Sequence, residues 1–253
     1  MEICVCVKRV PMVGGSIIVT PDGLDVDVSM SGFTVSPHEE CAVEEAVQIT
    51  ERLGGSVTVL TLGPAEAAGQ LRDMLALGAG RGILLETDGA EWGPVATAAA
   101  IAGAIRDGGF DLLLFGNEAA DTGGYQVPVR VAHALGLPCV TGIKRLEFID
   151  GDSARILASR EYRGAEEVFE LPLPAVVSVK EGINLPRYPS LPGRLRAKRA
   201  TIETIEPQGG TEGLQKARLR VPETSSKGAQ VLGSGAEAVP ALVGLLDELG
   251  VLP

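Results

Sequence analysis

Apolar runs alternate with helical patterns over the first 137 residues, and this alternation limits the fold more than any other feature. Runs typical of buried strands cover residues 2–8, 56–62, 82–85 and 111–115. Apolar side chains at helical spacing follow these runs, at residues 37–53, 64–77, 94–106 and 127–135. Such a βαβαβαβα order with short connections requires a parallel sheet with helices on both faces and right-handed crossovers. The predicted fold class is therefore α/β with a doubly wound sheet.

The loop after residues 111–115 is the strongest candidate site. It carries Asp121 and the glycine pair Gly123-Gly124, and a helix begins next to Gln126. A glycine loop before a helix N-terminus favours anions, because free backbone N–H groups point at the ligand. In such sheets ligands bind at the carboxyl ends of strands, where the loops after residues 8, 62 and 115 converge. The loop is neither GxGxxG nor a P-loop, so a nucleotide site and an ordinary βα turn both stay open.

The pattern changes after Pro138. Strand-like runs at residues 139–149, 154–162 and 165–171 are separated by the turn residues Asp150-Gly151-Asp152 and Arg163-Gly164, which predicts antiparallel pairing. A further buried strand ends at Val179. We therefore expect a mostly parallel sheet with an antiparallel extension.

Residues 184–199 contain three prolines, Pro186, Pro189 and Pro192, and we expect a stiff loop without regular structure there. Leu191 on this loop is either a docking side chain or a covered loop leucine. The only basic cluster of the chain follows, with Arg194, Arg196, Lys198 and Arg199. Residues 207–234 predict an extended arm and residues 234–249 a terminal helix, an arrangement typical of contact with a partner subunit.

Charge and composition exclude several classes of function. A net charge of −11 and an aromatic content of 4% argue against a nucleic-acid surface. No apolar run reaches membrane-spanning length. The four cysteines have no metal-ligand spacing, the two histidines lie far apart, and we expect no metal site and a reducing, cytoplasmic location. Cys4 and Cys6 share one strand face and are expected in the core.

Four glutamates lie in the first turns of the helix at 37–53: Glu39, Glu40, Glu44 and Glu45. The helix dipole favours negative charge at this end, so we interpret these side chains as solvated structural charge.

Four segments together resemble one protein family. They are VCVKRVP near the start, SPHEECAVEEAVQI from Ser36, LALGAGRGILL from Leu75, and ELPLPAVVSVKEGINLPRYPSLPGRLRAKR from Glu170. The last is the most specific, because it combines LPAVV with an Asn-x-Pro-Arg-Tyr-x-x-Leu-Pro run and a basic end. Over nearly its whole length the chain resembles the β subunit of electron transfer flavoprotein.

The resemblance implies an electron carrier without substrate turnover of its own. It implies a Rossmann-like nucleotide-binding domain over residues 1–185, a partner-docking loop over 186–199, and an arm and helix over 200–253 that contact an α subunit. Family members take electrons from flavin dehydrogenases, such as the acyl-CoA dehydrogenases of fatty acid oxidation, and pass them to a quinone oxidoreductase or similar acceptor. The α subunit mainly holds the working FAD, and most β subunits hold a structural AMP.

The resemblance also assigns residues. The family's nucleotide site maps onto Cys6, Leu62, Asp121, Thr122, Gly123, Gly124, Tyr125, Gln126 and Val127. The docking loop maps onto Pro186, Arg187, Tyr188, Leu191 and Pro192, with Leu191 as the anchor. The glutamate on the inter-subunit electron path maps onto Glu161, beside Arg160.

The nucleotide loop departs from the family patterns. It reads Asp121-Thr122-Gly123-Gly124-Tyr125-Gln126 and matches neither ordinary nor electron-bifurcating members. AMP is favoured over a second FAD because the Gly-Asp-Thr of bifurcating members is absent. The alternatives are a bifurcating β subunit that holds its own FAD, and a stand-alone ATP-binding protein of similar fold. The docking loop and the arm favour the carrier subunit.

Overall fold

The structure is a computed structural model that describes residues 1–12, 17–90, 92–149, 152–208, 216–222 and 229–252. Its centre is a seven-stranded sheet in the order β12-β5-β4-β1-β6-β11-β7, and every neighbouring pair is parallel. The strands are β1 Glu2–Cys6, β4 Ser56–Gly63, β5 Arg81–Glu86, β6 Leu112–Gly116, β7 Cys139–Ile143, β11 Ala175–Val179 and β12 Ile202–Ile205. The predicted α/β class with a mostly parallel sheet is confirmed.

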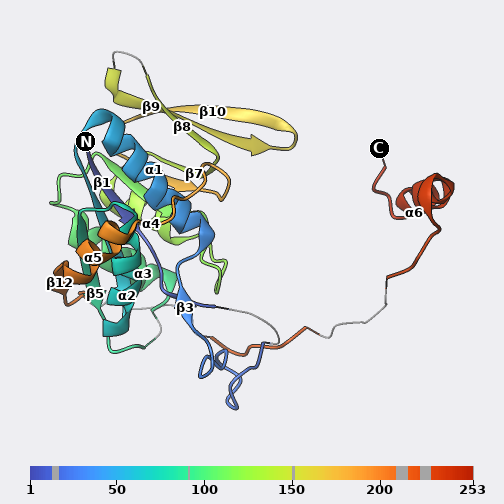
Figure 1. Cartoon of the computed structure of the whole chain (residues 1–253), viewed down its shortest axis with the longest axis horizontal. Helices are drawn as coiled ribbons and strands as arrows, with labels where there is room; N and C mark the ends of the chain where they lie inside the picture. Colours follow the sequence, from blue (N-terminus) through green and yellow to red (C-terminus); the bar gives the residue numbers. More distant parts are fainter. Residues whose placement is uncertain (13–16, 91, 150–151, 209–215, 223–228, 253) are drawn as a thin grey trace.

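Helices cover both faces of this sheet (Figure 1). They are α1 Pro37–Leu53, α2 Ala68–Leu77, α3 Pro94–Ile105, α4 Val127–Leu135 and α5 Leu191–Arg199, with a short 3-10 turn at Ala65–Ala67 before α2. Buried side chains of α1, α2 and α5 form one core with one face of the sheet, and those of α3 and α4 form a second core with the other face. β1 alternates between the cores: Ile3 and Val5 belong to the first, Cys4 and Cys6 to the second. The predicted core role of the two cysteines is confirmed.

The strand order reverses beside β1. From β1 the chain proceeds to β4 and β5 on one side and then returns to form β6 on the other. The carboxyl ends of β1 and β6 therefore lie next to each other at the switch point, where ligands bind in doubly wound sheets. A two-stranded ribbon, β2 Val10–Pro11 and β3 Phe33–Thr34, lies between β1 and α1 in the sequence.

One strand prediction was wrong. Residues 139–149 were expected to be a single antiparallel strand, but β7 belongs to the main sheet and β8 Arg145–Ile149 belongs to a separate three-stranded sheet. Gly142 within β7 has φ 73°, a left-handed conformation that suits glycine, at the point where the pairing of β7 with β11 shifts register.

The predicted antiparallel extension is confirmed. β8 pairs with β9 Asp152–Tyr162, and β9 pairs with β10 Ala165–Pro172. Arg163 and Gly164 both have positive φ, as a two-residue hairpin turn requires. Asp150 and Gly151 of the other predicted turn lie outside the described residues.

The expectation of no regular structure over 184–199 was wrong for its second half. Leu191–Arg199 form α5, whose N-cap Ser190 accepts a hydrogen bond from the Gly193 N–H at 3.1 Å. Pro192 lies in the first helical turn, where an N–H has no intrahelical partner and proline is tolerated.

The predicted arm also begins later than residue 200, because β12 pairs with β5 at the edge of the main sheet. Residues 209–215 and 223–228 of the arm lie outside the described residues. The terminal helix is confirmed as a 3-10 turn at Gly235–Ala238 followed by α6 Val239–Glu248. No residue of α6 is buried, and Figure 1 shows it standing apart from the sheet. Within the described ranges, no helix is both long and apolar enough to cross a membrane.

Candidate functional site

The switch point brings the predicted nucleotide loop against the end of the first strand. Lys8, just beyond β1, places its Nζ 2.9 Å and 2.7 Å from the two carboxylate oxygens of Asp121. Cys6 ends β1 and is buried, and Leu62 near the end of β4 packs against the same core cluster. The structure thus places Cys6, Leu62 and Asp121 along one edge of the sheet, as predicted.

The loop backbone turns tightly before α4. The N–H groups of Thr122 and Gly123 donate to the Ala119 carbonyl, at 3.3 Å and 2.9 Å. Gly123 and Tyr125 are left-handed, with φ 54° and 55°, and this conformation is uncommon for a tyrosine. Residues 120–125 are all exposed, but the N–H groups of Ala120, Thr122 and Gly123 are already bonded within the chain, so the backbone at Gly124 and Tyr125 is the part left to meet a ligand.

Gln126 and Val127 form the junction between the loop and α4. The Gln126 Oε1 accepts hydrogen bonds from the Arg130 Nε and Nη2, at 3.2 Å and 2.9 Å. Arg130 therefore places a positive charge at the first turn of the helix, beside the loop. Pro128 contributes no N–H, so the helix start has one donor fewer than usual. Sequence reasoning missed Arg130, although its spacing of four from Gln126 on one helix is a usable signal.

The start of α1 also borders this edge of the sheet, and its role there was not predicted from the sequence. The Ser36 Oγ accepts from the Ala120 N–H at 2.9 Å, which ties α1 to the loop. The Glu39 Oε2 accepts from the N–H groups of Lys8 and Ser36, at 3.0 Å and 3.3 Å. Glu39 packs against Gly116, where an added Cβ would lie 2.5 Å from its Cγ.

The interpretation of the early α1 glutamates as solvated was wrong for two of the four. Glu39 and Glu44 are buried, because each has partners from distant parts of the chain. Burial raises the pKa of Glu39 from its ordinary 4.5 to about 8, against the smaller opposing effect of its backbone hydrogen bonds. Between these values the folded chain keeps a proton that the unfolded chain has lost. Stability therefore falls as pH rises through this window and levels off above it.

Glu161 and Arg160, the predicted inter-subunit residues, are neighbours on β9 with different surroundings. The Arg160 Nε donates to the Glu167 Oε2 at 2.7 Å, and its guanidinium lies 5.0 Å from the Phe169 ring centre. The Glu161 side chain is 76% exposed, with the Lys144 Nζ 3.5 Å from its carboxylate. Arg160 is held within the three-stranded sheet, and Glu161 projects towards solvent.

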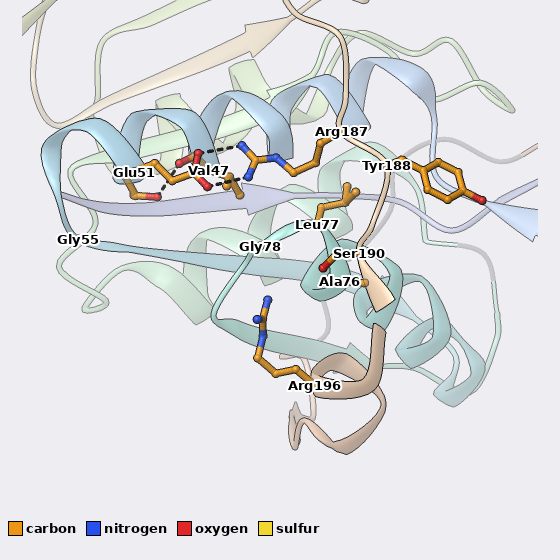
Figure 2. Close-up of a pocket in the computed structure, with 11 residues that line it drawn as sticks. Val47, Glu51, Gly55, Ala76, Leu77, Gly78, Arg187, Tyr188, Ser190 and Arg196 are labelled. Carbon is orange, nitrogen blue, oxygen red and sulfur yellow. Dashed lines mark hydrogen bonds and ion pairs between the residues drawn. The ribbon is translucent and has the colours of Figure 1, made fainter. Parts of the chain in front are cut away.

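The predicted docking residues lie on the α1–α2 face, away from the nucleotide loop. Two of them, Arg187 and Tyr188, border a hollow of about 520 Å³ that reaches Gly55 and Gly78, before the amino ends of β4 and β5 (Figure 2). Tyr188 and Leu191 are exposed, so the alternative of a covered loop leucine was wrong. Arg187 instead turns inward, and Figure 2 shows its guanidinium reaching along α1 to Glu51.

The described ranges hold no group of three or more histidine, cysteine, aspartate or glutamate side chains arranged to hold a metal ion. All four cysteines are free thiols. Burial raises the pKa of the Cys6 thiol well above its ordinary value, in keeping with a core position.

Comparisons with known proteins agree with this architecture. A family model described as electron transfer flavoprotein domain matches residues 26–208. Electron transfer flavoprotein subunit beta of Bacillus subtilis is 35% identical over 223 residues, which are 85% of this chain and 86% of that protein. The subunit of the same name from Syntrophomonas wolfei is 34% identical over 91% of this chain and 90% of its own. That of Bradyrhizobium diazoefficiens is 33% identical over the full length of both chains. The chain belongs to the electron transfer flavoprotein β subunit family.

Proposed function

We propose that the chain pairs with an α subunit to form a heterodimeric electron carrier between flavin dehydrogenases and a quinone oxidoreductase or similar acceptor. Acyl-CoA dehydrogenases are the proposed donors, and the chain itself turns over no substrate. The observation that carries this proposal is that two segments far apart in the sequence, 185–191 and 239–248, each expose apolar side chains. A self-sufficient enzyme has no use for them, whereas a carrier subunit needs both a permanent and a transient partner.

The permanent partner is the α subunit, bound by the arm and α6. Val239, Leu242 and Val243 of α6 are all exposed, although they recur on the helix as a buried face would. An exposed apolar helix face of this kind favours burial against another chain. We place the boundary of the arm after β12, with the nucleotide-binding domain before residue 186 and the docking segment between them.

The nucleotide edge suits AMP. Its donors are the Lys8 ammonium, the Arg130 guanidinium and the exposed loop backbone at Gly124 and Tyr125, all of which favour phosphate. Lys8 already neutralises Asp121, so the loop itself carries no uncompensated aspartate. AMP would stabilise the fold of this subunit, and FAD held mainly by the α subunit would supply the redox chemistry. The residues of this chain would orient the nucleotide and shield it from water.

The transient partner is the dehydrogenase. Leu185, Tyr188 and Leu191 form the exposed apolar part of the docking surface, and α5 adds Arg194, Arg196, Lys198 and Arg199 in an otherwise acidic chain. This combination fits an apolar pocket with an acidic rim. Opposite charges at the rim chiefly raise the association rate, so electron transfer should slow as salt increases. The free cysteine thiols suit the cytoplasm as the proposed location.

The test is co-expression with the α subunit, followed by anaerobic mixing of the purified complex with a substrate-reduced acyl-CoA dehydrogenase. The flavin absorbance of the complex should bleach, and a quinone analogue with its oxidoreductase should restore it. The proposal fails if the purified chain is a stable monomer that hydrolyses ATP, or if the flavin of the complex is reduced directly by NADH.

A further inference from the structure

One arginine of the docking segment is engaged almost entirely with helix α1. The Arg187 Nε lies 2.9 Å and Nη2 3.0 Å from the two carboxylate oxygens of Glu44, whose side chain is only 3% exposed. The Arg187 Nη1 and Nη2 also bind the two oxygens of Glu51, at 2.6 Å and 2.9 Å. The Arg187 backbone N–H adds a bond of 3.1 Å to Glu44. Glu44 thus binds both the backbone and the side chain of Arg187, and the guanidinium joins Glu44 to Glu51 along α1.

Two further contacts hold the ends of this segment. The Asn184 Nδ2 donates to the Cys41 carbonyl and to the Glu45 Oε2, at 3.0 Å and 2.9 Å. At the other end, Gly193 lies so close to α2 that an added Cβ would stand 2.6 Å from the Ala76 carbonyl oxygen. Residues 184–193 therefore lie across α1 and α2, with Arg187 as the fixed point between the two ends.

The apolar side chains on either side of Arg187 are exposed. Leu185 is 89% exposed, Tyr188 86% and Leu191 72%. Figure 2 shows the Tyr188 ring and the Arg187 guanidinium extending in opposite directions. The Arg194 guanidinium lies 5.1 Å from the Tyr188 ring centre, which links this surface to α5. Apolar side chains without a covering layer keep a fixed arrangement only if their backbone is held from behind.

We propose that Arg187 is a positioning residue of the docking surface, and that it does not itself contact the dehydrogenase. The Glu44–Arg187–Glu51 cluster holds Leu185, Tyr188 and Leu191 in the arrangement that the dehydrogenase binds, so the segment is ordered before docking. This lowers the entropy lost on binding. The inference rests on the proposed docking function and assigns Arg187 a different role from its neighbours Tyr188 and Leu191.

The burial of Glu44 determines the choice of variants. Arg187→Met alone leaves a buried carboxylate without its partner, which destabilises a fold for reasons unrelated to docking. The double variant Glu44→Gln/Arg187→Met removes both charges and keeps the packing volume. Arg187→Lys keeps the charge but not the paired hydrogen bonds and should rescue partially. Arg196→Met is the control for the hydrogen-exchange measurement, because it removes the same charge from an exposed arginine that lines the same hollow.

The first measurement is hydrogen exchange of the amides of Arg187 and Gly193, which donate to Glu44 and to Ser190, in the heterodimer before any dehydrogenase is added. We expect exchange about tenfold faster in the double variant, an intermediate value in Arg187→Lys, and no change in Arg196→Met or Leu191→Ala. The second measurement is electron transfer, where KM for the reduced dehydrogenase should rise about tenfold in the double variant with kcat unchanged.

Two results would overturn the inference. A segment that stays protected while KM rises would make Arg187 a direct partner contact. A segment that loosens while KM stays normal would make Arg187 purely structural. Leu191→Ala shows whether the proposed docking function itself is wrong. If electron transfer is normal in both Leu191→Ala and the Arg187 variants, the docking surface is rejected, and the inference about Arg187 is rejected with it.

Discussion

Replacing Leu191 by alanine removes most of the apolar surface that the docking segment presents at the start of α5. Full burial of a leucine side chain is worth about 1.5–3 kcal/mol. Leu191 is 72% exposed, so docking can bury roughly that share, which corresponds to about 1–2 kcal/mol. Because each factor of ten corresponds to ~1.4 kcal/mol, Leu191→Ala should weaken dehydrogenase docking about five- to thirtyfold.

The assay is anaerobic stopped-flow mixing of reduced dehydrogenase with the oxidised heterodimer, followed by flavin absorbance at several dehydrogenase concentrations. KM should carry the effect, because Leu191 lies far from the nucleotide edge and kcat reports transfer within the docked complex. Flavin content and reduction by dithionite should match the wild type. Met30→Ala is the control for loss of an exposed apolar side chain elsewhere, since Met30 is 96% exposed.

Thermal unfolding tests the competing explanation for any lost activity. An exposed side chain contributes little to folding, so Leu191→Ala should change the free energy of unfolding by less than about 0.5 kcal/mol. A clear fall in Tm together with a normal KM in the surviving complex would refute the docking role, because it would show that Leu191 is needed for packing.

Three further predictions concern the rest of the chain. Glu39→Gln removes a group with a pKa of about 8, so the loss of Tm between pH 5 and pH 8 should be smaller than in the wild type; an identical pH dependence would contradict the buried, protonated Glu39. Arg130→Met should weaken AMP binding to a nucleotide-stripped complex about tenfold by titration calorimetry, and equal affinity would place the phosphate elsewhere. Truncation after Gln208 should abolish co-purification with the α subunit and lower Tm of the isolated chain only slightly, because it removes the surface contacts of Lys216 with Asp25 and of the Leu219 N–H with the Gly23 carbonyl. Truncation after Arg199 should lower Tm clearly because β12 is lost, and normal pairing of either would reject the arm as the α contact.

The periodic part of the sequence was sufficient to predict the central strands of the sheet and the edge where their loops converge, although β7 and β12 were missed. Apolar runs separated by helical patterns leave few arrangements, so the strands around Cys6, Leu62 and Phe115 and their converging loops could be predicted from local pattern alone. The exposure of Leu191 could not be predicted, because a leucine among prolines can be either a docking side chain or a covered loop residue; the structure decides for exposure.

The buried charges could not be predicted in this way. Glu44 is buried because Arg187 covers it from 143 residues further along the chain, and Glu39 because Gly116 leaves room beside it. The helix dipole depends only on the position of a residue within the helix, so it gives no information on distant partners and favoured exposed carboxylates at both positions. α5 was missed for a related reason: prolines exclude a helix interior, but Pro192 stands in the first turn, where proline is accepted.

The most direct test of the account is a count of the nucleotides held by the purified heterodimer. The complex is denatured, the supernatant is separated by chromatography, and AMP and FAD are quantified against protein. The account predicts one FAD and one AMP per heterodimer, with AMP lost and FAD retained when Arg130 and Lys8 are both replaced by methionine. Two FAD per heterodimer would make this a bifurcating subunit, and the absence of any adenine nucleotide besides one FAD would contradict a nucleotide site at the β1–β6 edge.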